Sequence, residues 1–289
     1  MSIILVTGAN GQLGQELRVV SNSNQHHHWI FAGRQELDVT DAAAISDYVD
    51  HHKPEYIINC AAYTNVEKAE EDRDACMLGN AASPGYLAAA AHQYGATLFH
   101  ISTDYVFDGK GKAPYTESSP TAPLSVYGQS KLDGEIAVSA ASPAHFILRT
   151  SWLYSTFGNN FYKTMIRLAK ERAALSVVSD QFASPTYARL LAEDLVKMID
   201  ILASGESIPF GTYHYTQTGT ASWFDFAQAI VDKHHLNVPV SPVNSDAFPQ
   251  KAKRPAYSKM DTSLFLKNTG LSLLSWQEGL EYCIQNENV

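Results

Sequence analysis

Cysteine is scarce in this sequence, and the three that occur, Cys60, Cys76 and Cys283, have no paired or CxxC spacing. This pattern argues against a disulfide framework or a zinc site and favours reduced thiols. The chain also lacks an apolar run long enough to span a bilayer, and Met1 leads directly into the apolar segment 3–6 without the basic region of a signal peptide. We therefore expect a soluble, cytoplasmic protein with no membrane partner.

Positive charge is in short supply as well, since the 289 residues include 21 Lys and Arg against 30 Asp and Glu, a formal net charge of −9. Binding to DNA or RNA depends on Lys and Arg side chains that neutralise phosphates, so we expect no nucleic-acid partner. With 45% hydrophobic and 18% charged residues, the chain has an ordinary globular composition. Its length suits one large core and a smaller lobe, and its composition argues against disorder or a fibrous architecture.

Short apolar segments alternate with longer helical ones through the first half of the chain. The predicted strands lie at 3–7, 29–32, 56–60, 97–102 and 145–150, and predicted helices follow residue 14 or lie at 41–51, 80–94 and 124–140. Strict alternation indicates βαβ units. The expected fold class is therefore α/β, with a Rossmann-type doubly wound parallel sheet.

A glycine run connects the first predicted strand to the first predicted helix. Gly8, Gly11 and Gly14 are spaced by three residues, and the absence of side chains lets backbone N–H groups and the helix N-terminus approach a pyrophosphate. A tight turn with no ligand would explain the glycines alone about as well. Because they follow a strand and open a helix, we favour dinucleotide binding.

The end of the second predicted strand bears on the choice of dinucleotide. An acid at this place binds the ribose hydroxyls of NADH, whereas an arginine accommodates the 2′-phosphate of NADPH. Arg34 stands there, which favours NADPH over NADH, although a solvated surface arginine is the plain alternative. Glu36 and Asp38 follow closely and weaken the preference.

After residue 150 the alternation becomes less regular. We expect residues 1–150 to form an NAD(P)-binding Rossmann domain, and 151–289 to form mostly a smaller C-terminal substrate-binding lobe, partly interleaved with the sheet. The proline-bearing stretch 238–255 is expected to be irregular structure that caps a cleft.

A phenol and an ammonium lie one helical turn apart at Tyr127 and Lys131. A nearby ammonium and an oxidised nicotinamide would lower the pKa of Tyr127, and a phenol so tuned can protonate the alkoxide that forms when hydride reaches a ketone. Ser102 and Thr103 end the fourth predicted strand, at the sheet edge where ligands bind. An ordinary surface pair would explain Tyr127 and Lys131 in isolation, but together with the glycine turn they favour catalysis.

Several longer motifs resemble the extended short-chain dehydrogenases/reductases and, within them, the dTDP-4-dehydrorhamnose reductases. The motifs are TGANGQLG (7–14), DVTD (38–41), NCAAYTNVEKAE (59–70), STDYVFDG (102–109), YGQSK (127–131), RTSWLY (149–154), GNNF (158–161), DQFASPT (180–186) and RPAYSKMDT (254–262). Together they extend over nearly the whole chain.

The resemblance implies a role for each matching residue. The implied catalytic set is Thr103, Tyr127 and Lys131, with Thr103 bound to the keto oxygen, Tyr127 as proton donor, and Lys131 at the nicotinamide ribose. With Gly14 and Arg34 added from the arguments above, the cofactor-binding set is Gly8, Gly11, Gln12, Leu13, Gly14, Arg34, Asp38, Val39, Ala61, Ala62, Tyr63, Tyr127 and Lys131. The implied substrate-binding set is Thr103, Asp104, Tyr105, Tyr127, Trp152 and Arg254. Trp152 could instead be core, and Arg254 could belong to a structural ion pair.

The implied activity is NAD(P)H-dependent reduction of the C4 ketone of dTDP-4-dehydro-L-rhamnose to dTDP-L-rhamnose. The related dehydratases continue their strand-four motif Thr-Asp-Glu, whereas Asp104 is followed here by Tyr105, which disfavours dehydration. Two alternatives stay open: a non-catalytic NADP-binding regulatory subunit like that of methionine adenosyltransferase, and a reductase or epimerase of another nucleotide sugar.

Metal binding and assembly are less defined by the sequence. Some reductases of this family bridge a homodimer through Mg²⁺ held by carboxylates, and Glu16 is a candidate ligand, but the sequence does not reveal a full ligand set. The metal is therefore left open. The run His26–His28 has no carboxylate or cysteine at ligand spacing nearby, so we expect a solvated loop there.

Overall fold

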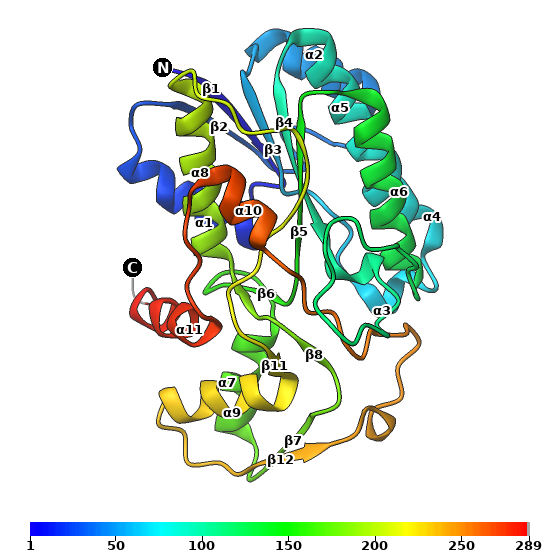
Figure 1. Ribbon diagram of the computed structural model, residues 1–289, viewed down its shortest axis with the longest axis vertical. Coiled ribbons are helices and arrows are strands. Elements are labelled where there is room, and N and C mark those ends of the chain that lie inside the picture. The colour runs from blue at the N-terminus through cyan, green and yellow to red at the C-terminus, as the bar shows by residue number, and fades with distance from the viewer. Residues whose placement is uncertain (288–289) are drawn as a thin grey trace.

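A six-stranded parallel sheet forms the centre of the computed structural model, which describes residues 1–287 (Figure 1). The strand order is β10-β5-β4-β3-β1-β2, with every neighbouring pair parallel. The strands are β1 (Ile3–Thr7), β2 (His28–Ala32), β3 (Tyr56–Asn59), β4 (Thr97–Thr103), β5 (His145–Thr150) and β10 (Gly211–His214). The expected α/β class with a Rossmann-type sheet is confirmed.

Helices cover both faces of this sheet. On one face α1 (Gln12–Ser23) packs beside α8 (Ala188–Ala203), and on the other α5 (Ser83–Tyr94) packs between α2 (Ala42–His52) and α6 (Val126–Ala141) (Figure 1). Successive strand side chains point to opposite faces. Ile4 and Val6 therefore join the core beneath α8, while Leu5 joins the core beneath α5.

Three short segments connect β3 to α5, and a fourth follows β4. They are α3 (Val66–Ala69), α4 (Arg73–Met77), a π-helical turn η1 (Leu78–Ala82) and a 3₁₀ turn η2 (Asp104–Val106). The helix expected to begin at residue 80 thus starts with a π-turn and becomes α-helical at Ser83.

Most of the remaining chain builds a smaller body around a separate core that includes Tyr154, Tyr187 and Phe226. Its helices are α7 (Phe161–Glu171), α9 (Trp223–Lys233) and α11 (Trp276–Gln285). Its paired strands are β6 (Leu153–Tyr154) with β9 (Thr186–Tyr187), β7 (Leu175–Val178) with β12 (Val240–Val243), and β8 (Phe182–Ala183) with β11 (Ala221–Ser222). By contrast α8, β10 and α10 (Ser263–Thr269) pack in the large body, although they too follow residue 150.

The stretch 238–255 is more ordered than expected. It includes β12, which pairs with β7 even though Pro242 lies within it, and a 3₁₀ turn η3 (Ser245–Ala247). Proline is tolerated here because β12 is an edge strand with one neighbour. Further along, Lys251 pairs with Glu71, which follows α3, so this stretch connects the smaller body to the large one.

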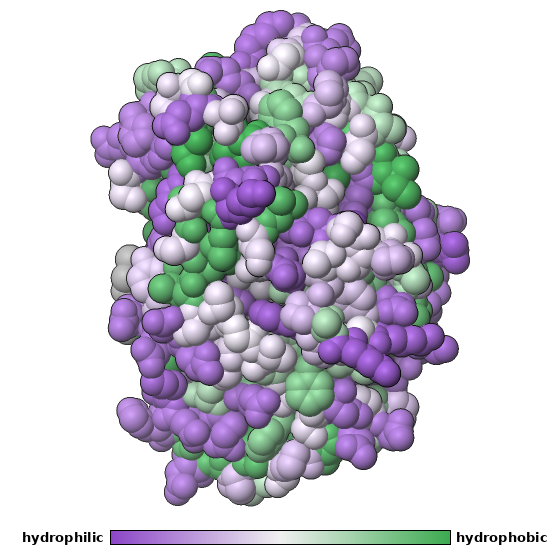
Figure 2. All heavy atoms as spheres, viewed as in Figure 1, coloured by the Kyte–Doolittle hydropathy of each residue, from purple (hydrophilic) through white to green (hydrophobic). Residues whose placement is uncertain are grey.

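The surface is mixed in character. On the face drawn in Figure 2, hydrophilic and hydrophobic side chains are interspersed. Within residues 1–287, no helix combines the length and apolar character needed to cross a membrane.

Candidate functional site

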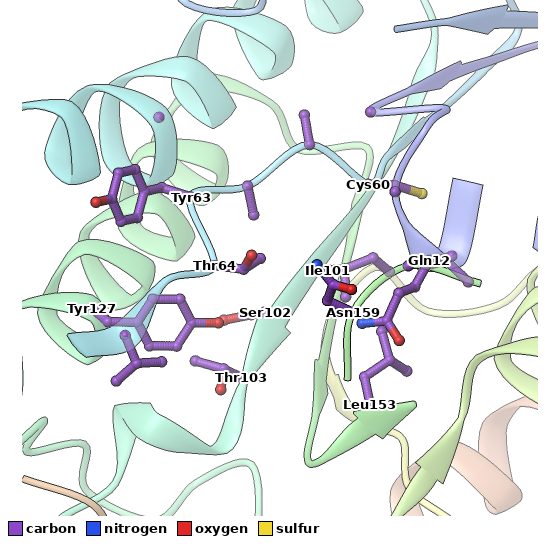
Figure 3. Close-up of a pocket in the computed structure, with 18 of the residues that line it drawn as sticks. Gln12, Cys60, Tyr63, Thr64, Ile101, Ser102, Thr103, Tyr127, Leu153 and Asn159 are labelled. Carbon is purple, nitrogen blue, oxygen red and sulfur yellow. The ribbon is translucent and has the colours of Figure 1, made fainter. Parts of the chain in front are cut away.

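A cavity of about 1100 Å³ opens at the carboxyl ends of the sheet strands, between the large and small bodies. Sixteen of the residues predicted for the site line it, namely Gly8, Gly11, Gln12, Leu13, Arg34, Asp38, Val39, Ala61, Ala62, Tyr63, Thr103, Asp104, Tyr105, Tyr127, Trp152 and Arg254. Two predicted residues, Gly14 and Lys131, do not line it. In Figure 3, Tyr127 reaches toward the strand end that carries Ser102 and Thr103, while Gln12 and Leu153 face it across the cavity.

The glycine turn brings backbone close to the cavity. Gly8 has φ +64°, and a Cβ atom there would lie 2.5 Å from the main-chain nitrogen of Ala61, so only glycine fits this position. Gly11 is the N-cap of α1 and offers no side chain to the first N–H groups of the helix. Those N–H groups and the positive end of the helix dipole suit a phosphate. Gly14 instead lets α1 pack on the turn, because a Cβ there would lie 2.6 Å from Cα of Ala9.

The end of β2 carries the groups predicted to choose the cofactor. The Arg34 side chain is 86% exposed, and its Nε atom lies 3.8 Å from a carboxylate oxygen of Asp38. Asp38 also accepts hydrogen bonds from the backbone and hydroxyl of Thr40, which hold its pKa below the ordinary value with a smaller contribution from Arg34. Glu36 accepts a bond from the backbone N–H of Gly33. Both acids thus have local partners, while Arg34 is largely in solvent at the rim of the cavity.

Tyr127 sits in the first turn of α6, where Ser125 caps the helix. Its ring meets that of Tyr105 edge-on, with centroids 5.5 Å apart. Burial raises the pKa of the Tyr127 phenol well above its usual value, and contact with Thr103 opposes this only in part. The expectation of a lowered pKa is therefore wrong for the protein groups alone. A phenol with a raised pKa is neutral at physiological pH and carries a proton to donate.

Lys131 is 2% exposed and does not line the cavity. Its ammonium donates a hydrogen bond to the carbonyl oxygen of Ile101 at 2.7 Å and lies 3.4 Å from Nε2 of His100. Burial lowers the pKa of Lys131 to about 8, and the carboxylate of Glu135 opposes the shift. The raised pKa of Tyr127 is caused mainly by burial, and the predicted lowering of this pKa by Lys131 is not seen.

The end of β4 carries a compact hydrogen-bonded group. Thr103 Oγ1 accepts from the backbone N–H of Tyr105 at 3.2 Å and donates to Asp104 Oδ1 at 3.1 Å. The Ser258 hydroxyl donates to the other oxygen of Asp104. Burial raises the pKa of Asp104 to about 6, against the lowering effect of the bonds from Ser258 and Thr103. Ser102 also borders the cavity, and its hydroxyl donates to Glu135. Thr103 is the strand-end hydroxyl that contacts the Tyr127 phenol.

An aromatic wall faces this group from the smaller body. Trp152 stacks on Trp223 with ring centroids 3.5 Å apart and planes 10° from parallel, and Phe161 packs on Trp223 at 4.5 Å. Trp152 has φ +48°, an uncommon backbone conformation for a bulky residue. Because all three rings line the cavity, Trp152 is not a plain core residue.

Arg254 has features of both interpretations given to it. Its Nη2 atom lies 3.5 Å from a carboxylate oxygen of Glu67, a weak ion pair. Its Nε atom is buried with no hydrogen-bond partner within the described chain, and the residue lines the cavity. The guanidinium thus keeps donor capacity for a ligand.

Comparisons with known proteins agree with this geometry. The family model described as "RmlD substrate binding domain" matches residues 1–289. A "dTDP-4-dehydrorhamnose reductase" of Aggregatibacter actinomycetemcomitans is 40% identical over 97% of this chain and 98% of its own length. The chain belongs to the dTDP-4-dehydrorhamnose reductase family.

Two further relatives of this reductase family cover the chain equally well. The "Spore coat polysaccharide biosynthesis protein SpsK" of Bacillus subtilis is 36% identical over 100% of this chain and 99% of its own. The crystal structure of a dTDP-4-dehydrorhamnose reductase from Bacillus anthracis in complex with NADP is 41% identical, covers 98% of this chain and 99% of its own, and superposes with a TM-score of 0.93. The predicted family is thereby confirmed.

As a member of this reductase family, the chain departs from the expectation for Glu16. The Glu16 side chain is fully buried and accepts bonds from the Ser155 hydroxyl at 2.6 Å and from Nε of Arg189 at 2.5 Å. Its carboxylate is therefore one half of an internal ion pair, which argues against the role of Mg²⁺ ligand for which it was a candidate.

Sequence reasoning on this reductase missed residues that act through distant contacts. Ser258, Trp223 and Phe161 each border or brace the site, but no role was predicted for any of them, although Phe161 ends the motif GNNF (158–161). His100, Asn59 and Thr7 are joined by buried hydrogen bonds next to the site. The Asn59 Nδ2 atom lies 3.1 Å from His100 Nδ1, and the Asn59 Oδ1 atom accepts from the Thr7 hydroxyl at 2.8 Å. The position of Ser258 inside the motif RPAYSKMDT was the other available signal.

Proposed function

We propose that this chain catalyses the reduction of the C4 ketone of dTDP-4-dehydro-L-rhamnose to dTDP-L-rhamnose, with NADPH as the preferred reductant. The observation that carries the proposal is the neutral, half-buried phenol of Tyr127, beside Thr103 on the same cavity as the glycine turn. An open parallel sheet binds its ligands at this edge.

The cavity residues fit a dinucleotide along one side. Gly8, Gly11, Gln12 and Leu13 would hold the pyrophosphate, Asp38 and Val39 the adenine, and residues 61–63 the middle of the cofactor. When bound, the cofactor supplies the hydride. Arg34 at the rim would take the 2′-phosphate, which is the basis for the preference for NADPH over NADH.

The protein's own contribution to the reaction is a proton at a fixed position. Hydride addition to the ketone carbon forms a C–H bond and leaves negative charge on the oxygen. The Tyr127 hydroxyl donates its proton to that oxygen as the O–H bond forms, and solvent then restores the phenol. Thr103 positions the same oxygen. Lys131 places positive charge beneath the reacting groups, and its contact with the nicotinamide ribose stays a prediction.

The substrate would occupy the side of the cavity that the smaller body supplies. We propose that residues 151–289 form most of this substrate-binding lobe and residues 1–150 the NAD(P)-binding domain. The Trp152 ring offers an apolar face to the methyl group of a 6-deoxysugar. The free donors of Arg254 suit a diphosphate. Asp104 and Tyr105 lie between these two sets of groups.

A reductase of another nucleotide sugar is the second candidate, favoured by the 36% identity to SpsK. The non-catalytic regulatory alternative is weakened because Tyr127 lines the cavity as an available acid. A homodimer remains a prediction that sedimentation would test.

The decisive experiment supplies purified protein with NADPH or NADH and a panel of keto-sugar nucleotides that differ in base and sugar. We expect oxidation of NADPH with dTDP-4-dehydrorhamnose and formation of dTDP-rhamnose. Tyr127→Phe should lower kcat by about 100- to 10,000-fold, with NADPH binding retained. Tyr86→Phe, on α5 and outside the cavity lining, is the matched control. Near wild-type turnover by Tyr127→Phe would refute the mechanism, and turnover of a different keto-sugar alone would refute the substrate.

A further inference from the structure

Two histidines and a carboxylate meet where the loop between α1 and β2 approaches α8. Nε2 of His26 lies 3.2 Å from Oδ1 of Asp200, and Nε2 of His27 lies 2.8 Å from the same oxygen. One ligand atom from each residue can be chosen so that all three lie within 4.8 Å of one another. The two histidines are 174 and 173 positions from Asp200 in the chain, so the fold alone creates this cluster.

The cluster is partly preorganised. His27 is only 7% exposed and His28 begins β2, so the expectation of a solvated loop over His26–His28 is wrong for these two residues. Its ring packs edge-on against Trp29, whose indole N–H is bonded to the carbonyl oxygen of Asn24. The Nδ1 atom of His27 is buried without a partner among residues 1–287, so the ring's hydrogen bonding is directed through Nε2. His26, with 66% of its side chain exposed, closes the cluster from solvent.

This donor set matches a particular class of cation. Imidazole nitrogens with a carboxylate oxygen suit Zn²⁺ and its neighbours in the first transition row, whereas Mg²⁺ prefers oxygen ligands alone. At Zn–N and Zn–O lengths of roughly 2.0–2.2 Å, tetrahedral ligand atoms lie about 3.3 Å apart. The two observed N···O separations, 3.2 and 2.8 Å, approach that spacing.

We propose that His26, His27 and Asp200 form a binding site for Zn²⁺ or a similar divalent transition metal. Water would fill the fourth position, because His26 keeps that side of the cluster open to solvent. The site joins the loop at the amino end of β2 to α8, whereas the reductase cavity lies at the carboxyl ends of the strands. None of the three residues lines that cavity. The metal therefore stabilises the fold and takes no part in hydride transfer.

The plain alternative is a pair of His–Asp hydrogen bonds with no affinity for metal. Calorimetric titration of untagged, chelator-treated protein with Zn²⁺ separates the two. We expect saturable binding of one equivalent, weakened at least tenfold by either His26→Gln or Asp200→Asn. His51→Gln is the matched control. His51 lies beside His52 on α2, and these two histidines are not part of the group formed by His26, His27 and Asp200. The variant should therefore bind Zn²⁺ as the wild type does.

Thermal unfolding gives a second readout. Zn²⁺ should raise the midpoint of the wild type and of His51→Gln but not that of His26→Gln, while Mg²⁺ should leave all three unchanged. His26 is exposed, so its substitution leaves the fold intact even if Asp200→Asn disturbs α8. Binding that is unsaturable, or that His26→Gln leaves undiminished, would overturn the proposal. Reductase turnover is measured separately, so its outcome does not affect this test.

Discussion

The ammonium of Lys131 donates a hydrogen bond of 2.7 Å to the main-chain oxygen of Ile101. Ile101 lies two residues before Thr103 on β4, so this bond connects α6, which carries Tyr127, to the strand that carries the hydroxyl beside it. The bond holds the Lys131 ammonium against the strand that ends at Thr103, although Lys131 does not line the cavity. Lys131 is itself 2% exposed.

Replacing Lys131 with Met should lower turnover and also change how stability depends on pH. Burial lowers the pKa of Lys131 to about 8 in the folded protein, from an ordinary value of 10.5. The unfolded chain therefore binds more protons between these values, and the Lys131 contribution to stability rises as pH rises through that window. The free energy of unfolding of the wild type should increase relative to Lys131→Met by up to about 3 kcal/mol. Urea unfolding of both proteins at several pH values measures this difference. If their free energies of unfolding changed equally with pH, the lowered pKa assigned to Lys131 would be contradicted.

Asp104→Asn tests the opposite kind of shift. Burial raises the pKa of Asp104 to about 6, above its ordinary 3.8, so the folded protein binds more protons between these values. Wild-type stability should then fall as pH rises from about 4 to about 6, relative to a variant that cannot ionise. The amide can still contact Thr103 and Ser258. We expect the free energy of unfolding of Asp104→Asn to increase by on the order of 3 kcal/mol relative to the wild type over this range. Urea unfolding measures this difference. A difference between the two proteins that is constant with pH would refute the shift.

Much of the fold and part of the site could be predicted because their signals are local. The apolar strands, the glycine turn and the spacing from Tyr127 to Lys131 each lie within a few residues, and the structure places Gly8, Thr103 and Tyr127 on one cavity. The partners of the Lys131 ammonium, Ile101 and His100, lie on β4, outside its own helix, and helical spacing could not predict them.

The residues that could not be predicted depend on tertiary contacts. Ser258 reaches Asp104 across 154 positions, and Trp223 meets Trp152 only because α9 packs beside β6 in the smaller body. Burial also decides pKa values, as the raised pKa of Tyr127 shows, and burial of one side chain is a property of the whole fold.

Arg34→Ala should reduce the preference for NADPH. The side chain is 86% exposed at the cavity rim and its 3.8 Å contact with Asp38 is loose, so the guanidinium is available to a 2′-phosphate. We expect KM for NADPH to rise roughly tenfold, equivalent to about 1.4 kcal/mol, with KM for NADH almost unchanged. Steady-state kinetics with both cofactors measures this. Arg73→Ala, on α4 and outside the cavity, serves as control, and an equal change in both KM values would remove Arg34 from cofactor selection.

The buried pair of Glu16 and Arg189 should be structural. Removing the charge with Glu16→Gln leaves the Arg189 guanidinium buried without its counter-ion, which typically costs about 3–5 kcal/mol. Glu171→Gln is the matched control, because Glu171 pairs with Arg167 at 2.8 Å on the exposed face of α7, and exposed pairs contribute about 0.2–1 kcal/mol. Urea unfolding of both variants measures the contrast. Magnesium should leave the unfolding of the wild type unchanged, since both Glu16 oxygens are occupied by Ser155 and Arg189. A magnesium-dependent increase in wild-type stability that Glu16→Gln abolishes would instead restore Glu16 as a metal ligand.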